Sequence, residues 1–360
     1  MKSYNHLWEI FISDENIDAA IKKAVKGKRK RRRVRQCLNN PNFHNQIKEY
    51  AQNFYNYPHK PIEIYDGISR KKRTIIVPKF EEQVVHHMIV NVMMPIFTKG
   101  MYEHSYGSIP NRGGHKGAKQ IVKWIKDSNR DCKYCLKMDI RKYFESISHD
   151  ILLYKLRKNV HDERFMNVLE IAISVTNKGI PLGFYLSQWL ANWYLQDLDH
   201  YIKEQLRAKH YIRYMDDMVI FGSNKRKLHE MRKAIADYLE RNLNLQMKNN
   251  WQVFKFHYIT RKDKDIGRFL DFMGFRFYRN RITLRRTIML KASRKARRIY
   301  KAKKLTIHSA KQMLSYLGWI DATNTYQMYL AWIKPYVNIQ ECKRRVSSYD
   351  RRNNNADKLV

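Results

Sequence analysis

Acidic residues are scarce in this chain of 360 residues, which carries 33 Asp and Glu against 71 Lys and Arg. The formal net charge is +38 and the sequence pI is near 10.0. A balance this basic predicts binding to polyphosphates with a strong dependence on salt. The 24 Tyr and 7 Trp add candidate stacking surfaces for bases, although many aromatic rings must belong to the core.

Long hydrophobic runs and cysteines are also in short supply. No run of about 18 apolar residues occurs, and residues 1–6 lack an apolar signal core, so we expect a cytoplasmic protein without a membrane partner. The four cysteines are Cys37, Cys132, Cys135 and Cys342. Cys132-x-x-Cys135 has no second pair beside it and enters a strand-like run, which favours buried reduced thiols over a zinc or redox site. The 44% apolar content excludes wholesale disorder.

Two adjacent carboxylates, Asp216 and Asp217, lie between the β-prone stretches 211–213 and 218–221. Apolar flanks around an acidic centre predict a buried hairpin with charge at its tip. Because burying two like charges is costly, we expect a divalent cation beside them. A solvated acidic turn is the alternative.

A third carboxylate, Asp139, follows another strand-like run at 134–138. Three acids at the ends of apolar strands are what a two-metal phosphoryl-transfer centre needs, with ions about 3.5–4 Å apart. The expected cofactor is a pair of Mg²⁺ ions, since the ligands are oxygens and the substrate brings phosphates. Mn²⁺ is the substitute that oxygen ligands also suit.

These segments resemble the motifs of reverse transcriptases. Residues 139–144 are similar to the first palm motif of that family, 179–188 to the next and 214–217 to the third, in the family's order. The resemblance implies an α+β right-hand polymerase with fingers, a palm built on an antiparallel sheet, and a helical thumb. It extends over most of the chain through residues 70–78, 84–87, 104–108, 112–117, 248–253, 272–277 and 315–319.

Composition and resemblance together divide the chain. We expect a basic helical extension at 1–60, fingers at 61–135, and a palm at 136–281 with inserted fingers helices at about 149–178. A helical basic thumb would follow at 282–345, and then a tail at 346–360 in which residues 351–358 are expected to be frayed. From residue 282 onward 18 Lys and Arg face four Asp and Glu, which argues against an appended ribonuclease H with its own carboxylate site.

The resemblance also implies roles for single residues. Asp139, Asp216 and Asp217 would hold the metal ions together with the main chain of Ile140. Lys248 would protonate the leaving pyrophosphate as a general acid, or else it is a surface lysine. Met273 and Gly274 would form the primer grip. The residues implied in dNTP binding are Lys71 (with Lys72 as its rival), Arg73, Phe144 as a steric gate against the 2′-hydroxyl, Leu182, Gly183 and Ser187.

Two basic segments are predicted to bind nucleic acid. Residues 26–35 contain eight Lys or Arg, of which Lys28, Arg29, Arg31 and Arg32 are candidate RNA contacts. A solvated helix face or a targeting tag is the alternative. Four further residues recur at helical spacing and would face a template-primer duplex. They are Lys291, Arg294, Lys295 and Arg298.

One motif departs from the pattern of most reverse transcriptases and indicates a particular branch of the family. Most reverse transcriptases have Gln before the motif glycine and end in Ser-Pro, whereas this chain has Leu182 and ends in Ser187-Gln188. This pattern resembles the reverse transcriptases of diversity-generating retroelements and implies error-prone copying of template adenines, unless Leu182 only fills a pocket. The implied partners are structured template RNA, the RNA/cDNA duplex, dNTPs and a small basic helical accessory protein. An antiviral-defence or retron-type enzyme and a non-catalytic RNA-binding protein remain alternatives.

Overall fold

The computed structural model describes residues 4–65 and 72–356, with side chains described as far as residue 352. The chain divides into two compact units, one formed by residues 1–113 and 136–253 and the other by 114–135 and 254–360. Helices and antiparallel strand pairs occur in both units, which confirms the predicted α+β class. The assignment of segments to fingers, palm and thumb stays a prediction.

The first unit begins with helices, as the sequence predicted. They are α1 (Leu7–Phe11), α2 (Asp14–Val25), α3 (Arg32–Leu38) and α4 (Phe43–Gln52). The N-cap of α2 is Ser13, whose side chain accepts a hydrogen bond from the main-chain NH of Asn16 at 3.2 Å. The apolar stripe of α2 is buried and α2 packs against α5 (Phe80–Thr98), so this long apolar helix is covered by the N-terminal ones.

An exposed hairpin connects α4 to α5. Its strands are β1 (Ile62–Tyr65) and β2 (Lys72–Ile75), paired antiparallel with Tyr65 opposite Lys72. Lys71, one of the predicted dNTP contacts, lies outside the described residues. Lys72 lies on the hairpin and forms an ion pair of 2.7 Å with Glu63.

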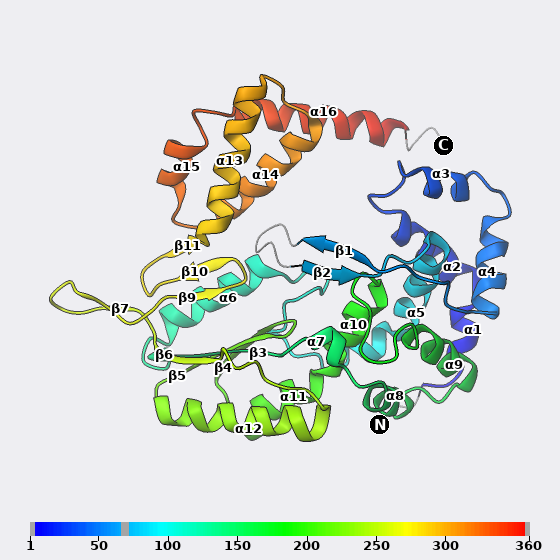
Figure 1. Ribbon diagram of the computed structural model, residues 1–360, viewed down its shortest axis with the longest axis horizontal. Coiled ribbons are helices and arrows are strands. Elements are labelled where there is room, and N and C mark those ends of the chain that lie inside the picture. Colours follow the sequence, from blue (N-terminus) through cyan, green and yellow to red (C-terminus); the bar gives the residue numbers. More distant parts are fainter. Residues whose placement is uncertain (1–3, 66–71, 357–360) are drawn as a thin grey trace. The chain divides into compact units, whose positions relative to one another are not determined.

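A four-stranded sheet forms the centre of the first unit. Its strands are β3 (Tyr134–Asp139), β4 (His210–Tyr214), β5 (Asp217–Gly222) and β6 (Gln252–Lys255), in the order β4-β5-β3-β6. The long helix α12 (Lys225–Leu243) packs against β5, and Figure 1 shows α11 (Gln196–His200) beside it. The remaining helical segments of this unit are α7 (Tyr143–Ser146), α8 (His149–Arg157), α9 (Glu163–Ile173), α10 (Tyr185–Tyr194) and the π-helical turn η1 (Tyr201–Gln205).

The second unit contains α6 (Gly114–Asp127) and the C-terminal elements. Short strands come first: β7 (Tyr258–Ile259), β8 (Asp265–Ile266), β9 (Leu270–Phe272), β10 (Phe275–Phe277) and β11 (Ile282–Leu284). Four helices follow: α13 (Arg286–Ala302), α14 (Ile307–Asp321), α15 (Tyr326–Trp332) and α16 (Ile339–Ala356). Helix α14 packs against α13 and α16 (Figure 1). The described part of the expected tail is not frayed, because α16 continues to Ala356.

Two expectations from composition can be compared with the structure. None of the helices in the described ranges is both long enough and apolar enough to cross a membrane. All four cysteines lie in those ranges, and each is buried without a disulfide bond, which confirms the prediction of buried thiols.

Candidate active site

The predicted acidic hairpin exists. Strands β4 and β5 are antiparallel, Tyr214 pairs with Asp217, and Met215 and Asp216 form the two-residue turn. Met215 has a φ of 55°, a conformation that glycine usually supplies at the first position of a tight hairpin turn. A side chain in this region costs on the order of 1–3 kcal/mol. Contacts around the turn must therefore hold Met215 in place.

The carboxylates at the turn share one pocket with Asp139. The pocket has a volume of about 370 Å³ and lies within the first unit. Residues from β2, the end of β3, α7 and the hairpin contribute to its wall, so segments far apart in sequence meet here. The predicted site residues that line it are Arg73, Asp139, Ile140, Phe144, Leu182, Asp216, Asp217 and Lys248.

The pKa of Asp216 is strongly raised. Burial, and then the negative charge of Asp139, raise the pKa of Asp216 to about 7 from an ordinary value of 3.8. The two carboxyl groups are close enough to share a hydrogen bond when one is protonated. Two carboxyl groups this close together indicate a position where a cation would favour the charged form of Asp216.

Lys248 lies beside Asp139 because residues 246–248 pair with residues 139–141. Its main-chain NH donates to the carbonyl of Asp139 at 2.8 Å, and Ile140 bridges to Met247 in antiparallel fashion. The Lys248 ammonium forms an ion pair with the Asp139 carboxylate, and this hydrogen bond raises the pKa of Lys248. Lys248 therefore belongs to the pocket, whereas its role as an acid stays a prediction.

The donor set of the pocket fits Mg²⁺. In the described part of the chain, no three His, Cys, Asp or Glu side chains form a ready ligand set. Asp139 turns toward Lys248, and an Asp217 oxygen lies 3.9 Å from the Lys137 ammonium. Mg²⁺ does not require a complete protein cage, because one or two carboxylates suffice when waters and substrate phosphates supply the other oxygens. Asp139 and Asp216 are such a pair.

A helical turn follows β3 and carries two adjacent aromatic rings, Tyr143 and Phe144, whose centroids are 5.6 Å apart. Lys142 has a φ of 44°, and α7 begins at the next residue, so the strand does not continue through Tyr143 and Phe144. The Tyr143 hydroxyl donates to the main-chain carbonyl of Ala191, and its ring is buried. Both aromatic residues contribute to the wall of the pocket, and Phe144 is the less buried of the two. Phe144 is therefore the ring that a ligand in the pocket can reach more easily.

Gly183 brings the segment before α10 against the end of β2. The NH of Ile76 donates to the carbonyl of Leu182 at 2.8 Å. Gly183 has a φ of 113°, and a Cβ there would lie 2.2 Å from the Ile76 carbonyl oxygen, so only glycine permits this approach. Neither Gly183 nor Ser187 lines the pocket, and Ser187 is buried within α10. Leu182 is the member of this motif that reaches the pocket.

A buried arginine behind the hairpin was not found by the sequence argument. Arg213 lies in β4 and is fully buried beside Asp199 of α11. Burial opposes its charge, but the Asp199 carboxylate outweighs burial and raises the pKa of Arg213. The available signal was an arginine inside a strand predicted to be buried, since buried charges require a partner.

The predicted nucleic-acid contacts differ in exposure. Arg29, Arg31 and Arg32 are exposed, whereas Lys28 is half-buried and donates to the Gln83 side chain at 2.6 Å. Burial lowers the pKa of Lys28. In the second unit, α13 buries an apolar face that includes Met289 and Ala292. Its predicted basic contacts, Lys291, Arg294, Lys295 and Arg298, lie on the exposed or half-buried remainder of the helix.

The predicted primer-grip residues form a hairpin turn in the second unit. Met273 and Gly274 connect β9 to β10 with φ values of 51° and 87°, as a two-residue type I′ turn requires. A Cβ at Gly274 would lie 2.9 Å from the Trp319 ring, so glycine is also needed for packing. Their role in primer binding stays a prediction.

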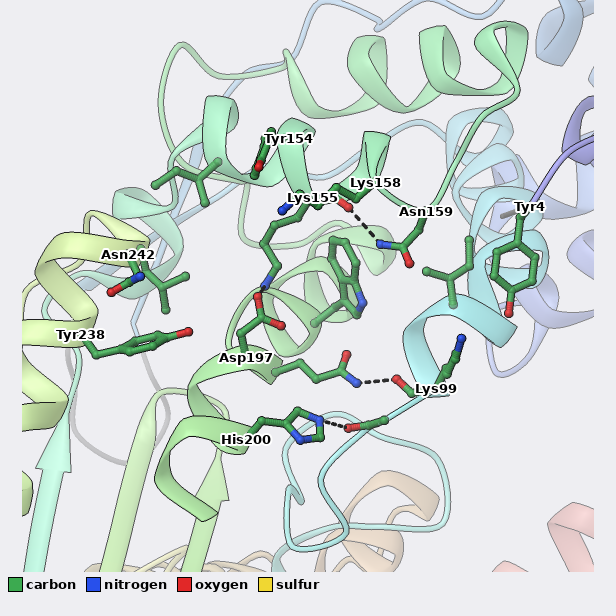
Figure 2. A pocket seen from close by; sticks show the side chains of 16 residues that line it. Tyr4, Lys99, Tyr154, Lys155, Lys158, Asn159, Asp197, His200, Tyr238 and Asn242 are labelled. Carbon is green, nitrogen blue, oxygen red and sulfur yellow. Dashed lines mark hydrogen bonds and ion pairs between the residues drawn. The ribbon is translucent and has the colours of Figure 1, made fainter. Parts of the chain in front are cut away.

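A second cavity, of about 500 Å³, shares no lining residue with the carboxylate pocket. Figure 2 shows it between α8, α11 and α12, with Lys155 directed at Asp197. Lys155 forms an ion pair of 3.0 Å with Asp197 and donates to the Tyr194 carbonyl at 3.0 Å. Burial lowers the pKa of Lys155. Helix α11 thus presents Asp197 to this cavity and Asp199 to Arg213.

An acidic pocket bordered by Arg73 and Lys248 is chemically suited to the transfer of phosphate-bearing groups. The family profile described as reverse transcriptase (RNA-dependent DNA polymerase) matches residues 59–320, most of the chain. The chain belongs to this family.

Individual relatives are distant. Protein YkfC of Escherichia coli is 23% identical over 55% of this chain and 65% of its own length. The retron Ec73 reverse transcriptase of Escherichia coli is 23% identical over 44% and 52%, and the group II intron-encoded protein LtrA of Lactococcus lactis is 24% identical over 43% and 27%. The chain thus spans less than two thirds of each of these relatives. Among solved structures, telomerase from Candida albicans aligns with a TM-score of 0.47 at 11% identity, over 81% of this chain and 60% of that one.

Proposed function

We propose that this protein is an RNA-directed DNA polymerase that joins dNTPs to a primer by two-metal nucleotidyl transfer. The observation that carries the proposal is the pocket in which Asp139, Asp216 and Asp217 meet Arg73 and Lys248. Membership of the reverse transcriptase family supports the same reaction.

In this proposal Asp139 and Asp216 hold the metal ions, and Asp217 and the main chain of Ile140 complete their surroundings. Bound Mg²⁺ would activate the 3′-hydroxyl oxygen of the primer for attack and stabilise the negative charge that develops on the phosphates. Asp216 must lose its proton before it can act as a ligand, because only the carboxylate form binds. Its pKa near 7 makes that loss dependent on pH in the physiological range.

The basic residues of the pocket have separate tasks. Arg73 would bind the triphosphate with fixed positive charge, and Lys71 is proposed to assist from outside the described residues. Lys248, kept protonated beside Asp139, would donate a proton to the leaving pyrophosphate. Lys72 also lines the pocket and is the rival of Lys71.

Two apolar side chains would select the nucleotide. Phe144 lines the pocket and would crowd a 2′-hydroxyl, so that deoxynucleotides are preferred. Leu182 lines it as well and offers no hydrogen bond to the incoming base. Gly183 and Ser187 would act indirectly, through the approach to Ile76 and the packing of α10.

Basic surfaces would bind the nucleic acid. We assign Arg29, Arg31 and Arg32 to structured template RNA, because they are exposed in a segment with eight basic residues. Lys28 is a weaker candidate because Gln83 already accepts its hydrogen bond. The basic residues of α13 would contact an RNA/cDNA duplex, and Met273 and Gly274 would contact the primer.

The finer proposal concerns the biological role. We infer a diversity-generating retroelement, with errors at template adenines and a small basic accessory protein, from Leu182 in the nucleotide pocket. The likeness to a retron reverse transcriptase favours the second candidate, a retron-type or defence enzyme. Leu182→Gln separates them: its adenine error rate should fall below that of the parent if Leu182 causes the errors, and an equal rate contradicts that role.

Primer extension on a defined RNA template tests the activity. The parent should extend the primer with dNTPs and Mg²⁺, and Asp216→Asn should abolish extension. Asp237→Asn is the matched control, because Asp237 is an exposed acid on α12 outside the pocket. Equal extension by the parent and Asp216→Asn would refute the catalytic assignment. RNA binding without extension, once the cognate RNA is supplied, would favour a non-catalytic RNA-binding protein.

A further inference from the structure

One buried guanidinium supports the turn that carries Asp216. Arg213 donates from Nη1 to the main-chain carbonyl of Met215 at 3.0 Å. Its Nε donates to both oxygens of Asp199, at 2.8 and 3.1 Å, and its Nη2 donates to one of them at 2.5 Å. Both residues are only 1% exposed. The fork of Arg213 therefore connects α11 to the hairpin turn without access to solvent.

The same guanidinium is fixed from two further directions. Its Nη1 and Nη2 each donate at 3.3 Å to Asn192 of α10, one to the side-chain oxygen and one to the carbonyl. Asn192 in turn donates to the Gly107 carbonyl at 2.8 Å. The Tyr211 hydroxyl donates to Asp199 at 2.7 Å. Each side-chain nitrogen of Arg213 and each carboxylate oxygen of Asp199 thus has a hydrogen-bond partner.

Gly107 closes the turn from another direction. A Cβ at Gly107 would lie 2.6 Å from the main-chain nitrogen of Met215 and 2.6 Å from its Cγ. The Met215 peptide is therefore confined by Gly107 through its NH side and by Arg213 through its carbonyl. This confinement explains how a methionine keeps the positive φ that the turn requires.

We propose that Arg213 and Asp199 are positioning residues that fix the Met215 peptide and thereby hold the Asp216 carboxylate next to Asp139. This inference rests on the proposed ion site. A buried ion pair contributes little net stability compared with apolar residues of similar size, so a role in geometry accounts for its presence better than stability does. Residues that orient metal ligands from behind commonly change metal affinity or activity about 10–100-fold when replaced.

The proposal predicts that charge alone is insufficient. Arg213→Lys keeps a positive charge for Asp199, but one ammonium cannot reproduce a fork that serves Asp199, Asn192 and Met215 together. Asp199→Asn combined with Arg213→Met removes both buried charges and leaves no unpaired ion. Gly107→Ala leaves the ion pair intact and displaces the turn from the other side. Each variant should weaken ion binding while the sheet remains folded.

Mn²⁺ binding measured by electron paramagnetic resonance tests this without activity. Asp216→Asn sets the signal for loss of the site. Asp197→Asn is the matched control, because Asp197 lies on the same helix and has its own ion pair, with Lys155, but faces the separate cavity in Figure 2. We expect Arg213→Lys and the double variant to lower Mn²⁺ affinity about 10–100-fold, and Asp197→Asn to leave it unchanged. Circular dichroism and thermal unfolding would establish that each variant is folded.

The possible results are distinct. Parental Mn²⁺ affinity in the folded Arg213 variants would overturn the positioning role. If those variants do not fold, Gly107→Ala decides: weaker Mn²⁺ binding supports the confined turn, and unchanged binding refutes it. The variants could lose Mn²⁺ affinity while the parent never extends a primer. That result would support the positioning role and refute the proposed polymerase activity. A parent that binds no Mn²⁺ would overturn the positioning role, whereas primer extension alone decides the polymerase activity.

Discussion

Replacing Asp216 by Asn should stabilise the ion-free protein above pH 7, because it removes a charge that the fold resists. Burial and Asp139 raise the pKa of Asp216 from 3.8 to about 7. At 1.36 kcal/mol for each pKa unit, this rise corresponds to about 4 kcal/mol. Part of the rise comes from Asp139, which can relax toward Lys248. We therefore expect about 2–4 kcal/mol of additional stability in Asp216→Asn at pH 8.

The sign of the pH dependence follows from the direction of the shift. A carboxyl with a raised folded-state pKa keeps its proton in the folded chain while the unfolded chain ionises. The parent should therefore lose stability between about pH 4 and pH 7, and the loss should level off above pH 7. The advantage of Asp216→Asn should grow over the same range and be absent near pH 4.

Urea unfolding at several pH values, with EDTA and separately with Mg²⁺, measures this difference. Mg²⁺ should stabilise the parent and not Asp216→Asn, because a ligand of the native state stabilises it by mass action. Asp237→Asn serves as the exposed control and should show no comparable pH trend. Equal stability of parent and Asp216→Asn at pH 8 in EDTA would refute the reasoning about burial.

Three other perturbations have expected outcomes. Gly183→Ala should destabilise the protein and abolish extension, because its Cβ would lie 2.2 Å from the Ile76 oxygen. Gly318→Ala in α14 is the control, since its Cβ would meet nothing within 4 Å. Urea unfolding should show that Gly318→Ala raises the free energy of unfolding by about 0.5–1 kcal/mol. If template RNA binds the basic segment, replacing Arg29, Arg31 and Arg32 by alanine should make the plot of log affinity against log salt less steep. The slope should change by about 1 for each phosphate that is no longer neutralised. An unchanged slope in a filter-binding titration would exclude RNA binding by these arginines. Lys248→Met should slow extension about 100-fold or more. The rate of the parent should fall at alkaline pH as Lys248 loses its proton, and the variant should lack this fall. A variant with the pH profile of the parent would show that Lys248 is not the acid.

Local sequence patterns were sufficient to predict the acidic residues of the pocket and much of its secondary structure. The β-prone apolar stretches on both sides of Asp216 and Asp217 predicted the β4–β5 hairpin, and the run before Asp139 predicted β3. These predictions succeeded because short apolar runs and acidic turns depend on neighbours in the chain. The position of Cys132 and Cys135 at a strand-like run also anticipated buried thiols, and the excess of Lys and Arg anticipated exposed basic residues.

Which residues meet was settled by the packing of distant segments. Lys248 is more than a hundred positions from Asp139, and the main-chain pairing of residues 246–248 with 139–141 brings the two together. Whether Leu182 or Ser187 reaches the pocket depends on where Gly183 contacts β2. Asp199 and Arg213 show the same limit: a buried ion pair requires two partners from different elements, and no local pattern in the sequence specifies which charges the folded chain will enclose together.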